Sequence, residues 1–280
     1  SIGLFFLNGL NFGIDFKGGT LIEIETQNKI EISEVRSSLN SLSLGDVQVQ
    51  EFGSDKNLLI RIEQQQGGDQ IQQNVLEIVK QKLTSDISET INFRRTEVVG
   101  PKVSGELIQS GTIAILVAVF AMLIYIWLRF EWQFSLGAVI ALLHDVILTI
   151  GVFCLTQLEF NLPIIAAILT IVGYSMNDTV VVYDRVRENL RKFRSKEITS
   201  LLNLSINETL SRTIVTSVTT LLALVSLYIF GGEVIKGFTF AMIWGVLVGT
   251  YSSIFVAAPL LTYLDVKREW NTTTAVDSTK

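Results

Sequence analysis

Residues 107–128 read LIQSGTIAILVAVFAMLIYIWL, a run that contains no charged residue and is almost continuously apolar after Thr112. A helix of this length, rising ~1.5 Å per residue, is long enough to cross the ~30 Å hydrocarbon core of a bilayer. Further apolar runs follow at 134–156, 162–183, 213–230 and 238–264. We therefore expect residues 107–264 to form an α-helical polytopic membrane bundle.

The composition supports this division of the chain. Hydrophobic residues make up 49% of the 280 residues. Many of the charged residues lie in the first part of the chain, since 1–106 hold 10 of the 22 basic and 15 of the 27 acidic residues. A polar domain followed by long continuous apolar runs excludes a soluble enzyme, a disordered chain, a coiled coil and a transmembrane barrel. One cysteine and one histidine exclude a disulfide within the chain and a Cys-rich or His-rich metal site.

The sequence carries no P-loop, no GxSxG and no HExxH motif. We therefore expect no enzymatic activity, no catalytic residue, no cofactor and no bound metal. The net charge of −5 gives no support for nucleic-acid binding.

The polar segment 8–106 has the periodicity of an α+β domain. Apolar and polar residues alternate in four segments that we expect to be strands, 20–27, 47–52, 58–63 and 90–99. Helical spacing predicts two helices, 34–44 and 70–84. The residues 53–55 between the second and third strands predict a hairpin turn. The order β-α-β-β-α-β is that of a ferredoxin-like domain.

Residues 1–7 are apolar but too few to cross a bilayer, so we interpret them as the end of a first transmembrane helix that begins before residue 1. Six spans are then expected, the first truncated here. The connection 184–212 carries seven basic and four acidic residues, which the positive-inside rule places in the cytoplasm. Counting along the chain puts the tail 265–280 on the same side and the domain 8–106 on the opposite side.

An ionisable residue inside an apolar span is costly, so it is a functional candidate. Asp178 is such a residue, seven positions before Arg185 and thus ~10 Å inside the cytoplasmic end of its span. Arg212 stands at the start of the next span, which runs antiparallel, so its long side chain could reach the carboxylate. A helix movement that changes this distance would change the protonation of Asp178, as a proton-driven cycle requires. A static buried ion pair is the alternative.

Other polar residues could support such a site. The residues that share one helical face with Arg212 are Thr216, Thr219, Thr220 and Ala223. We expect this face to pack on another helix rather than to face lipid. Ser175 and Asn177 stand beside Asp178 on the preceding span. His144 and Asp145 are adjacent in a third span and point about 100° apart, so spacing alone does not make them a pair; they could be structural or part of a proton relay.

Five motifs occur in order: NFGIDFKGG at 11–19, VGPKVSGEL at 99–107, ALLHDV at 141–146, IVGYSMNDTVVVYDRVREN at 171–189 and TLSRTIVTSVTTLLA at 209–223. Together they resemble the SecF family, accessory subunits of the bacterial Sec protein-translocation machinery. The resemblance covers residues 8 to 264. Asp178 matches the family's membrane-embedded aspartate, and Arg212 matches its partner arginine.

The resemblance implies a membrane fold of the resistance-nodulation-division (RND) type in the bacterial inner membrane, with a periplasmic domain at 8–106. It implies a complex with SecD that uses the proton gradient to help draw unfolded preproteins out of the SecYEG channel, after SecA has pushed them with ATP. Its partners would then be SecD, SecYEG, the preprotein and the lipid bilayer. Two alternatives remain: an RND-type small-molecule exporter, and a scaffold of the translocase that transports nothing.

Overall fold

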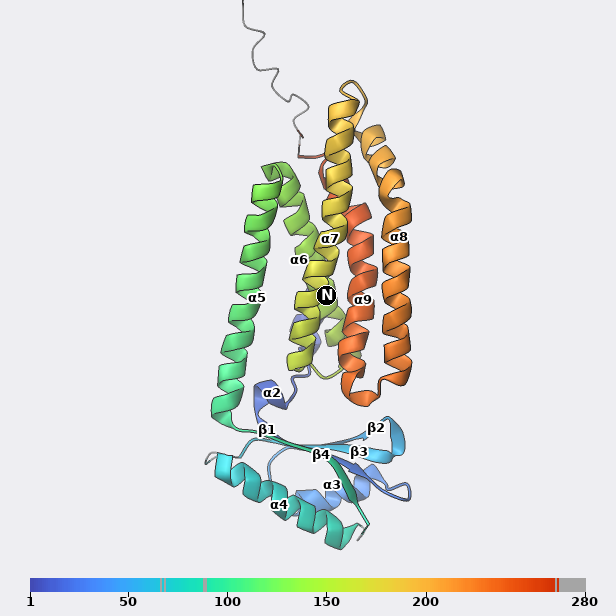
Figure 1. Cartoon of the computed structure of the whole chain (residues 1–280). Coiled ribbons are helices and arrows are strands. Elements are labelled where there is room, and N and C mark those ends of the chain that lie inside the picture. The colour runs from blue at the N-terminus through green and yellow to red at the C-terminus, as the bar shows by residue number, and fades with distance from the viewer. Residues whose placement is uncertain (66, 68, 88–89, 265, 267–280) are drawn as a thin grey trace, which may run out of the picture.

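The computed structural model describes residues 1–65, 67, 69–87, 90–264 and 266, so the expected tail 265–280, apart from Val266, lies outside the described residues. The chain forms a helical bundle with a small α+β domain at one end of it (Figure 1). This arrangement confirms the expected fold class.

Four strands and two helices build the α+β domain. The strands are β1 Gly19–Glu25, β2 Val47–Phe52, β3 Ser54–Ile62 and β4 Asn92–Val99, and the helices are α3 Ile32–Asn40 and α4 Asp69–Asp86. The sheet order is β2-β3-β1-β4, and each neighbouring pair is antiparallel. The β-α-β-β-α-β order is as expected. The turn between β2 and β3 is shorter than expected, since Gly53 alone reverses the chain with a φ of 79° that favours glycine.

The sheet has two different faces, because successive side chains of a strand point to opposite sides. One face pairs Ile22 with Ile60 and Ile24 with Leu58 across neighbouring strands. It packs against α3 and α4 in a core that also includes Val35, Leu39, Val75, Val79 and Leu83. The other face is turned toward the helical bundle (Figure 1).

Long helices lie at all five expected spans, although the last one ends at Leu260 instead of at the expected Leu264. They are α5 Pro101–Arg129, α6 Trp132–Thr156, α7 Leu162–Lys192, α8 Ile198–Phe230 and α9 Lys236–Ser252, which a short 3₁₀ turn precedes (η1 Glu233–Ile235) and a π-helical turn (η2 Ser253–Ala257) and α10 Ala258–Leu260 continue. Each of the five is long and apolar enough to cross a membrane. A short helix at the start of the chain, α1 Ile2–Asn8, contacts α6.

The segment 184–212 differs from the expected loop. It is helical except at 193–197, because α7 runs on to Lys192 and α8 already begins at Ile198. Polar contacts hold these two extensions together: the guanidinium of Arg185 lies 2.7 Å from Glu208 Oε2, and the Asn189 side-chain amide donates to the same oxygen. Both α7 and α8 therefore continue beyond their apolar runs, and polar side chains pair between the two extensions.

The α+β domain is attached to the loop between α6 and α7. Gly13 N donates to the carbonyl of Phe160 at 2.8 Å, and Phe160 N donates to Asn11 O at 2.7 Å. Asp15, in the short helix α2 (Ile14–Lys17), accepts a hydrogen bond from the backbone N–H of Leu162 at 2.8 Å. Leu162 is the first residue of α7, so the domain caps the helix that carries Asp178.

An ion pair strengthens this attachment. Arg61 of β3 lies 2.8 Å from Glu159 in the α6–α7 loop, and only 12% and 21% of the two side chains are exposed. Three phenylalanines pack edge to face or tilted beside it, Phe12, Phe16 and Phe160. The contacts join the domain to the membrane bundle through residues far apart in the chain.

Two glycines of α9 allow it to lie very close to α7. A Cβ atom added at Gly245 would overlap the side chain of Ile171, and one added at Gly249 would lie 2.9 Å from the Cβ of Ser175. Small residues at such positions let helix backbones approach closely inside a membrane. The GxxxG spacing in the last span therefore acts as a packing motif.

We expect Gly245→Ala to lower the thermal stability of the protein in detergent, because the added methyl group meets the buried Ile171 side chain. Overpacking of this kind costs about 1–3 kcal/mol. Gly173→Ala is the matched control, since a Cβ there has nothing within 4 Å, and alanine stabilises a helix by roughly 0.5–1 kcal/mol relative to glycine. Equal melting temperatures for the two variants would contradict the close α7–α9 contact.

Candidate functional site

A buried polar cluster joins three helices in the middle of the bundle. Its centre is Asp145 of α6, whose side chain is 1% exposed. Ser175 of α7 donates a hydrogen bond to Asp145 Oδ2 at 2.5 Å, and Ser252 of α9 donates to the same oxygen at 2.7 Å. The close approach at Gly249 brings α9 near enough for both hydroxyls to reach one carboxyl group. Asp145 thus ties α6, α7 and α9 together.

His144 also belongs to this cluster, which corrects the expectation drawn from spacing. Its Nδ1 lies 2.9 Å from Asp145 Oδ1, although the two Cα–Cβ bonds diverge on the helix. Rotation of two adjacent side chains is enough to close this gap. The His144 ring is partly exposed and stacks on Tyr251 of α9 with 6.5 Å between the ring centroids. The histidine therefore connects the buried carboxyl group with the surface of the bundle.

Asp178 lies one helix turn beyond Ser175 on the same buried face of α7. It is 3% exposed, and its Oδ2 is buried without a hydrogen-bond partner. Most buried polar atoms in proteins have a partner, so an unpaired carboxyl oxygen inside a membrane bundle needs an explanation. A carboxyl group that must gain and release a proton is one such explanation.

The expected ion pair between Asp178 and Arg212 is not formed in the structure. Arg212 is exposed at the surface of α8, and the Asp178 Oδ2 has no hydrogen-bond partner. The buried polar residues of α8 are Thr209, Thr213 and Ser217. Since Thr213 follows Arg212 by one residue, α8 buries a face about 100° away from the expected one. The face of Arg212 remains open in this single chain.

The other predicted site residues differ in whether they contact another helix. Thr216, Thr219 and Thr220 direct their hydroxyls to carbonyl groups of their own helix, so they make no bond across helices. Asn177 is exposed on α7. Ser175, His144 and Asp145 are the three that the fold brings together.

Sequence reasoning missed the polar contacts that α9 contributes. Besides Ser252, Thr250 lies 2.7 Å from Ser217 of α8, hydroxyl to hydroxyl, and the Tyr174 hydroxyl donates to Ser217 at 3.4 Å. The sequence contained a signal for the Ser252 contact. Ser252 follows Gly249, the second glycine of the GxxxG pair, by three residues, so the two lie next to each other on the helix surface. The Asp145 carboxyl group is thus bonded to hydroxyl groups of two other helices, and hydroxyl groups can both donate and accept hydrogen bonds.

Within the described part of the chain, no three His, Cys, Asp or Glu side chains gather as metal ligands would. The carboxyl group of Asp145, the imidazole of His144 and the hydroxyls of Ser175 and Ser252 are groups that can exchange or relay protons.

We expect Ser252→Ala to destabilise the folded protein, since it removes one of the donors to a buried carboxyl group. Hydrogen bonds to charged groups contribute about 1.5–3 kcal/mol. Ser226→Ala is the control, because the exposed Ser226 hydroxyl bonds only to Leu222 O in its own helix. Thermal unfolding of both variants in the same detergent is the measurement, and an equal loss in the two would argue against the Asp145 cluster.

Family models and individual proteins of known family both match this chain. The family model described as protein export membrane protein SecD/SecF, C-terminal, matches residues 79–267, and the SecD/SecF GG motif matches residues 3–30. The chain is 48% identical to the protein translocase subunit SecF of Rickettsia rickettsii, over 93% of this chain and 84% of that protein. It is 50% identical to SecF of Rickettsia bellii, over 92% and 84% of the two chains.

The fold has a solved relative. The crystal structure of SecDF from Thermus thermophilus, a translocon-associated membrane protein, superposes with a TM-score of 0.83 at 36% identity. The match covers 94% of this chain but only 35% of that longer SecDF chain. It covers both the membrane bundle and the α+β domain, and the curated relatives match over nearly the whole chain. The chain belongs to the SecD/SecF family of protein export membrane proteins.

Proposed function

We propose that this multi-pass membrane protein is an accessory subunit of the bacterial Sec protein-export machinery and couples proton entry to the late steps of export. Membership of the SecD/SecF family supports the export role. One observation carries the proton coupling: Asp178 is buried in a transmembrane helix with a carboxyl oxygen that has no partner. In this role the protein binds and moves other molecules and catalyses no covalent reaction.

The energy of the proton gradient is sufficient for such a movement. One elementary charge crossing the membrane releases about 2.3 kcal/mol per 100 mV. That is comparable with the cost of breaking one or two buried hydrogen bonds. A proton bound at Asp178 would remove the attraction between its carboxylate and Arg212, and α7 and α8 would then shift relative to each other.

The geometry offers a route from this shift to the external domain. Asp178 lies on α7, and the first residue of α7 is hydrogen-bonded to Asp15 of the α+β domain. The ion pair between Arg61 and Glu159 joins the same loop to the sheet. A displacement of α7 therefore pulls directly on the domain, which could hold an emerging polypeptide and keep it from sliding back.

SecD is the expected partner, since a single SecDF chain contains a region similar to 94% of this chain and extends well beyond it. A second polypeptide would also cover the open face of Arg212, which is costly to leave in lipid. By the positive-inside rule, the end of the bundle that carries Arg129 and Arg187 lies in the cytoplasm. The α+β domain at the opposite end would then be periplasmic, and the membrane would be the inner one. SecYEG, the SecA-driven preprotein and the lipid bilayer complete the expected surroundings.

The direct test is export of a reporter preprotein in cells whose only copy carries Asp178→Asn. We expect export to fall to the level of cells without the subunit, while SecD still co-purifies. Asp184→Asn is the matched control on the same helix. Its pair with Arg129 is more than 40% exposed on both sides, and such surface pairs contribute only ~0–1 kcal/mol.

Two other outcomes would contradict the proposal. Normal export with Asp178→Asn would favour a scaffold that only holds its partners together. Drug-stimulated proton flux by the purified complex in liposomes, without an effect of Asp178→Asn on export, would favour a small-molecule exporter.

A further inference from the structure

A groove of about 490 Å³ lies at the end of the bundle away from the sheet, where α7 extends beyond the corner between α5 and α6 (Figure 1). We call it the basic groove. The last residue of α5 and successive turns of α7 line it: Arg129, Asp184, Arg187, Glu188, Arg191 and Lys192. Ligand pockets commonly measure about 300–1,000 Å³, so the groove has room for a small charged group.

The basic groove has an excess of positive charge, because four cations and two carboxylates line it. The Asp184 carboxylate lies 2.7 Å from the guanidinium of Arg129. The Glu188 carboxylate lies 2.6 Å from Arg185, a cation outside the lining. Both carboxylates are therefore already paired with cations, and an anionic group that enters the groove would be attracted.

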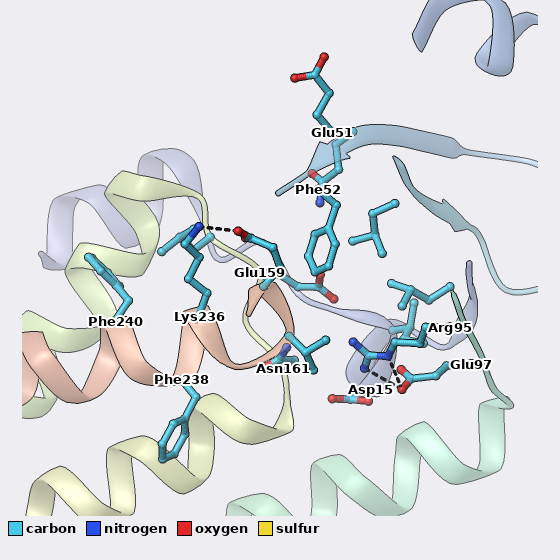
Figure 2. A pocket seen from close by; sticks show the side chains of 18 of the residues that line it. Asp15, Glu51, Phe52, Arg95, Glu97, Glu159, Asn161, Lys236, Phe238 and Phe240 are labelled. Carbon is cyan, nitrogen blue, oxygen red and sulfur yellow. Dashed lines mark hydrogen bonds and ion pairs between the residues drawn. The ribbon is translucent and has the colours of Figure 1, made fainter. Parts of the chain in front are cut away.

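The cavity at the other end of the bundle has the opposite charge balance. It measures about 330 Å³ and lies between the sheet and the bundle (Figure 2). Five acidic and only two basic residues line it. Arg95 pairs with Glu97, as Figure 2 shows, and Lys236 pairs with Glu233. Of these two spaces, only the basic groove would attract an anion.

The basic groove lies at the level where the apolar runs end. Arg129 directly follows the apolar run 107–128, and Asp184 directly follows the run 162–183. Helices whose apolar runs fill the hydrocarbon core place the next residues among the lipid headgroups. The phosphate layer of the bilayer is therefore expected at the depth of this groove.

Apolar side chains are exposed near Arg129 on both helices of the corner. Trp127 and Leu128 of α5 and Trp132 of α6 are each more than half exposed. Tryptophan is enriched at the membrane–water interface, which agrees with the depth inferred from the apolar runs. A lipid can lay its acyl chains on this apolar surface while its headgroup reaches the cations. A free phosphate ion would gain nothing from the apolar surface, so the combination favours a lipid.

We propose that the basic groove binds the headgroup of an anionic phospholipid, at the side of the membrane that the positive-inside rule assigns to the cytoplasm. The phosphate lies against Arg191 and Lys192 at the end of α7, and the acyl chains lie along the exposed surface of α5 and α6. Basic pockets between transmembrane helices on this side are known to bind anionic headgroups. This binding does not depend on the proton coupling proposed for Asp178.

The test is photolabelling of the full chain with its SecD partner in nanodiscs of phosphatidylcholine. The probe is a trace of phosphatidylglycerol with a photoreactive group in one acyl chain, and the comparison probe is phosphatidylcholine with the same chains. Mass spectrometry identifies the labelled residues. We expect the phosphatidylglycerol probe to label the corner 127–136 more strongly than the phosphatidylcholine probe.

Arg191→Gln combined with Lys192→Gln removes two cations from exposed positions in the lining and should lower this labelling roughly tenfold. Arg194→Gln combined with Lys196→Gln is the matched control, because it removes the same charge from the connection 193–197, outside the lining. We expect the control variant to keep the labelling of the unchanged protein.

Several results would overturn the proposal. Equal labelling by the two probes would mean that the corner meets only bulk lipid, and an equal loss in the two double variants would mean a diffuse attraction to surface charge. Loss of labelling with millimolar inorganic phosphate would assign the groove to a free anion. Labelling that appears only without SecD would make the groove part of the SecD contact.

Discussion

The hydrocarbon interior of a membrane cannot solvate a carboxylate, and the fold around Asp145 and Asp178 follows from that constraint. Asp145 satisfies it by accepting hydrogen bonds from Ser175 and Ser252 on two other helices. Those bonds need α9 to lie against α7, which Gly245 and Gly249 permit. The small residues and the buried acid are therefore parts of one arrangement.

Asp178 does not meet this constraint through hydrogen bonds. It is buried like Asp145, but one of its oxygens has no partner, and Arg212 on the next helix is exposed and forms no ion pair with it. The bundle thus contains one carboxyl group that is hydrogen-bonded to other helices, Asp145, and one with an unpartnered oxygen, Asp178. Asp145 joins three helices through hydrogen bonds, while in the proposed mechanism Asp178 is the group that gains and loses a proton. The hydrogen bond from Leu162 N–H to Asp15 links α7, which carries Asp178, to the α+β domain.

Much of this architecture can be predicted from the sequence, because run length and periodicity report burial directly. Long apolar runs identified the five spans, and alternation identified the strands of the sheet. Ser175 and Asp178 were recognisable as polar residues in an apolar span. The orientation of α8 was predicted wrongly, because a helix that is apolar on almost every side has no strong stripe to fix which face is buried.

The contacts between distant residues could not be predicted in the same way. Ser252 reaches Asp145 only because two glycines in another part of α9 allow close packing. His144 meets Asp145 through side-chain rotation, which Cα–Cβ directions do not describe. The extension of α7 and α8 beyond the membrane depends on the pairing of Arg185 with Glu208, whose partners are 23 residues apart.

The central claim is that the Asp178 carboxyl group gains and loses a proton within the folded protein. Infrared difference spectroscopy of the complex in lipid, recorded over a pH titration, tests it most directly. We expect a carbonyl band of a protonated carboxyl group that disappears as the pH rises and is missing in Asp178→Asn. A spectrum in which Asp178→Asn removes no pH-dependent carboxyl band would contradict the claim.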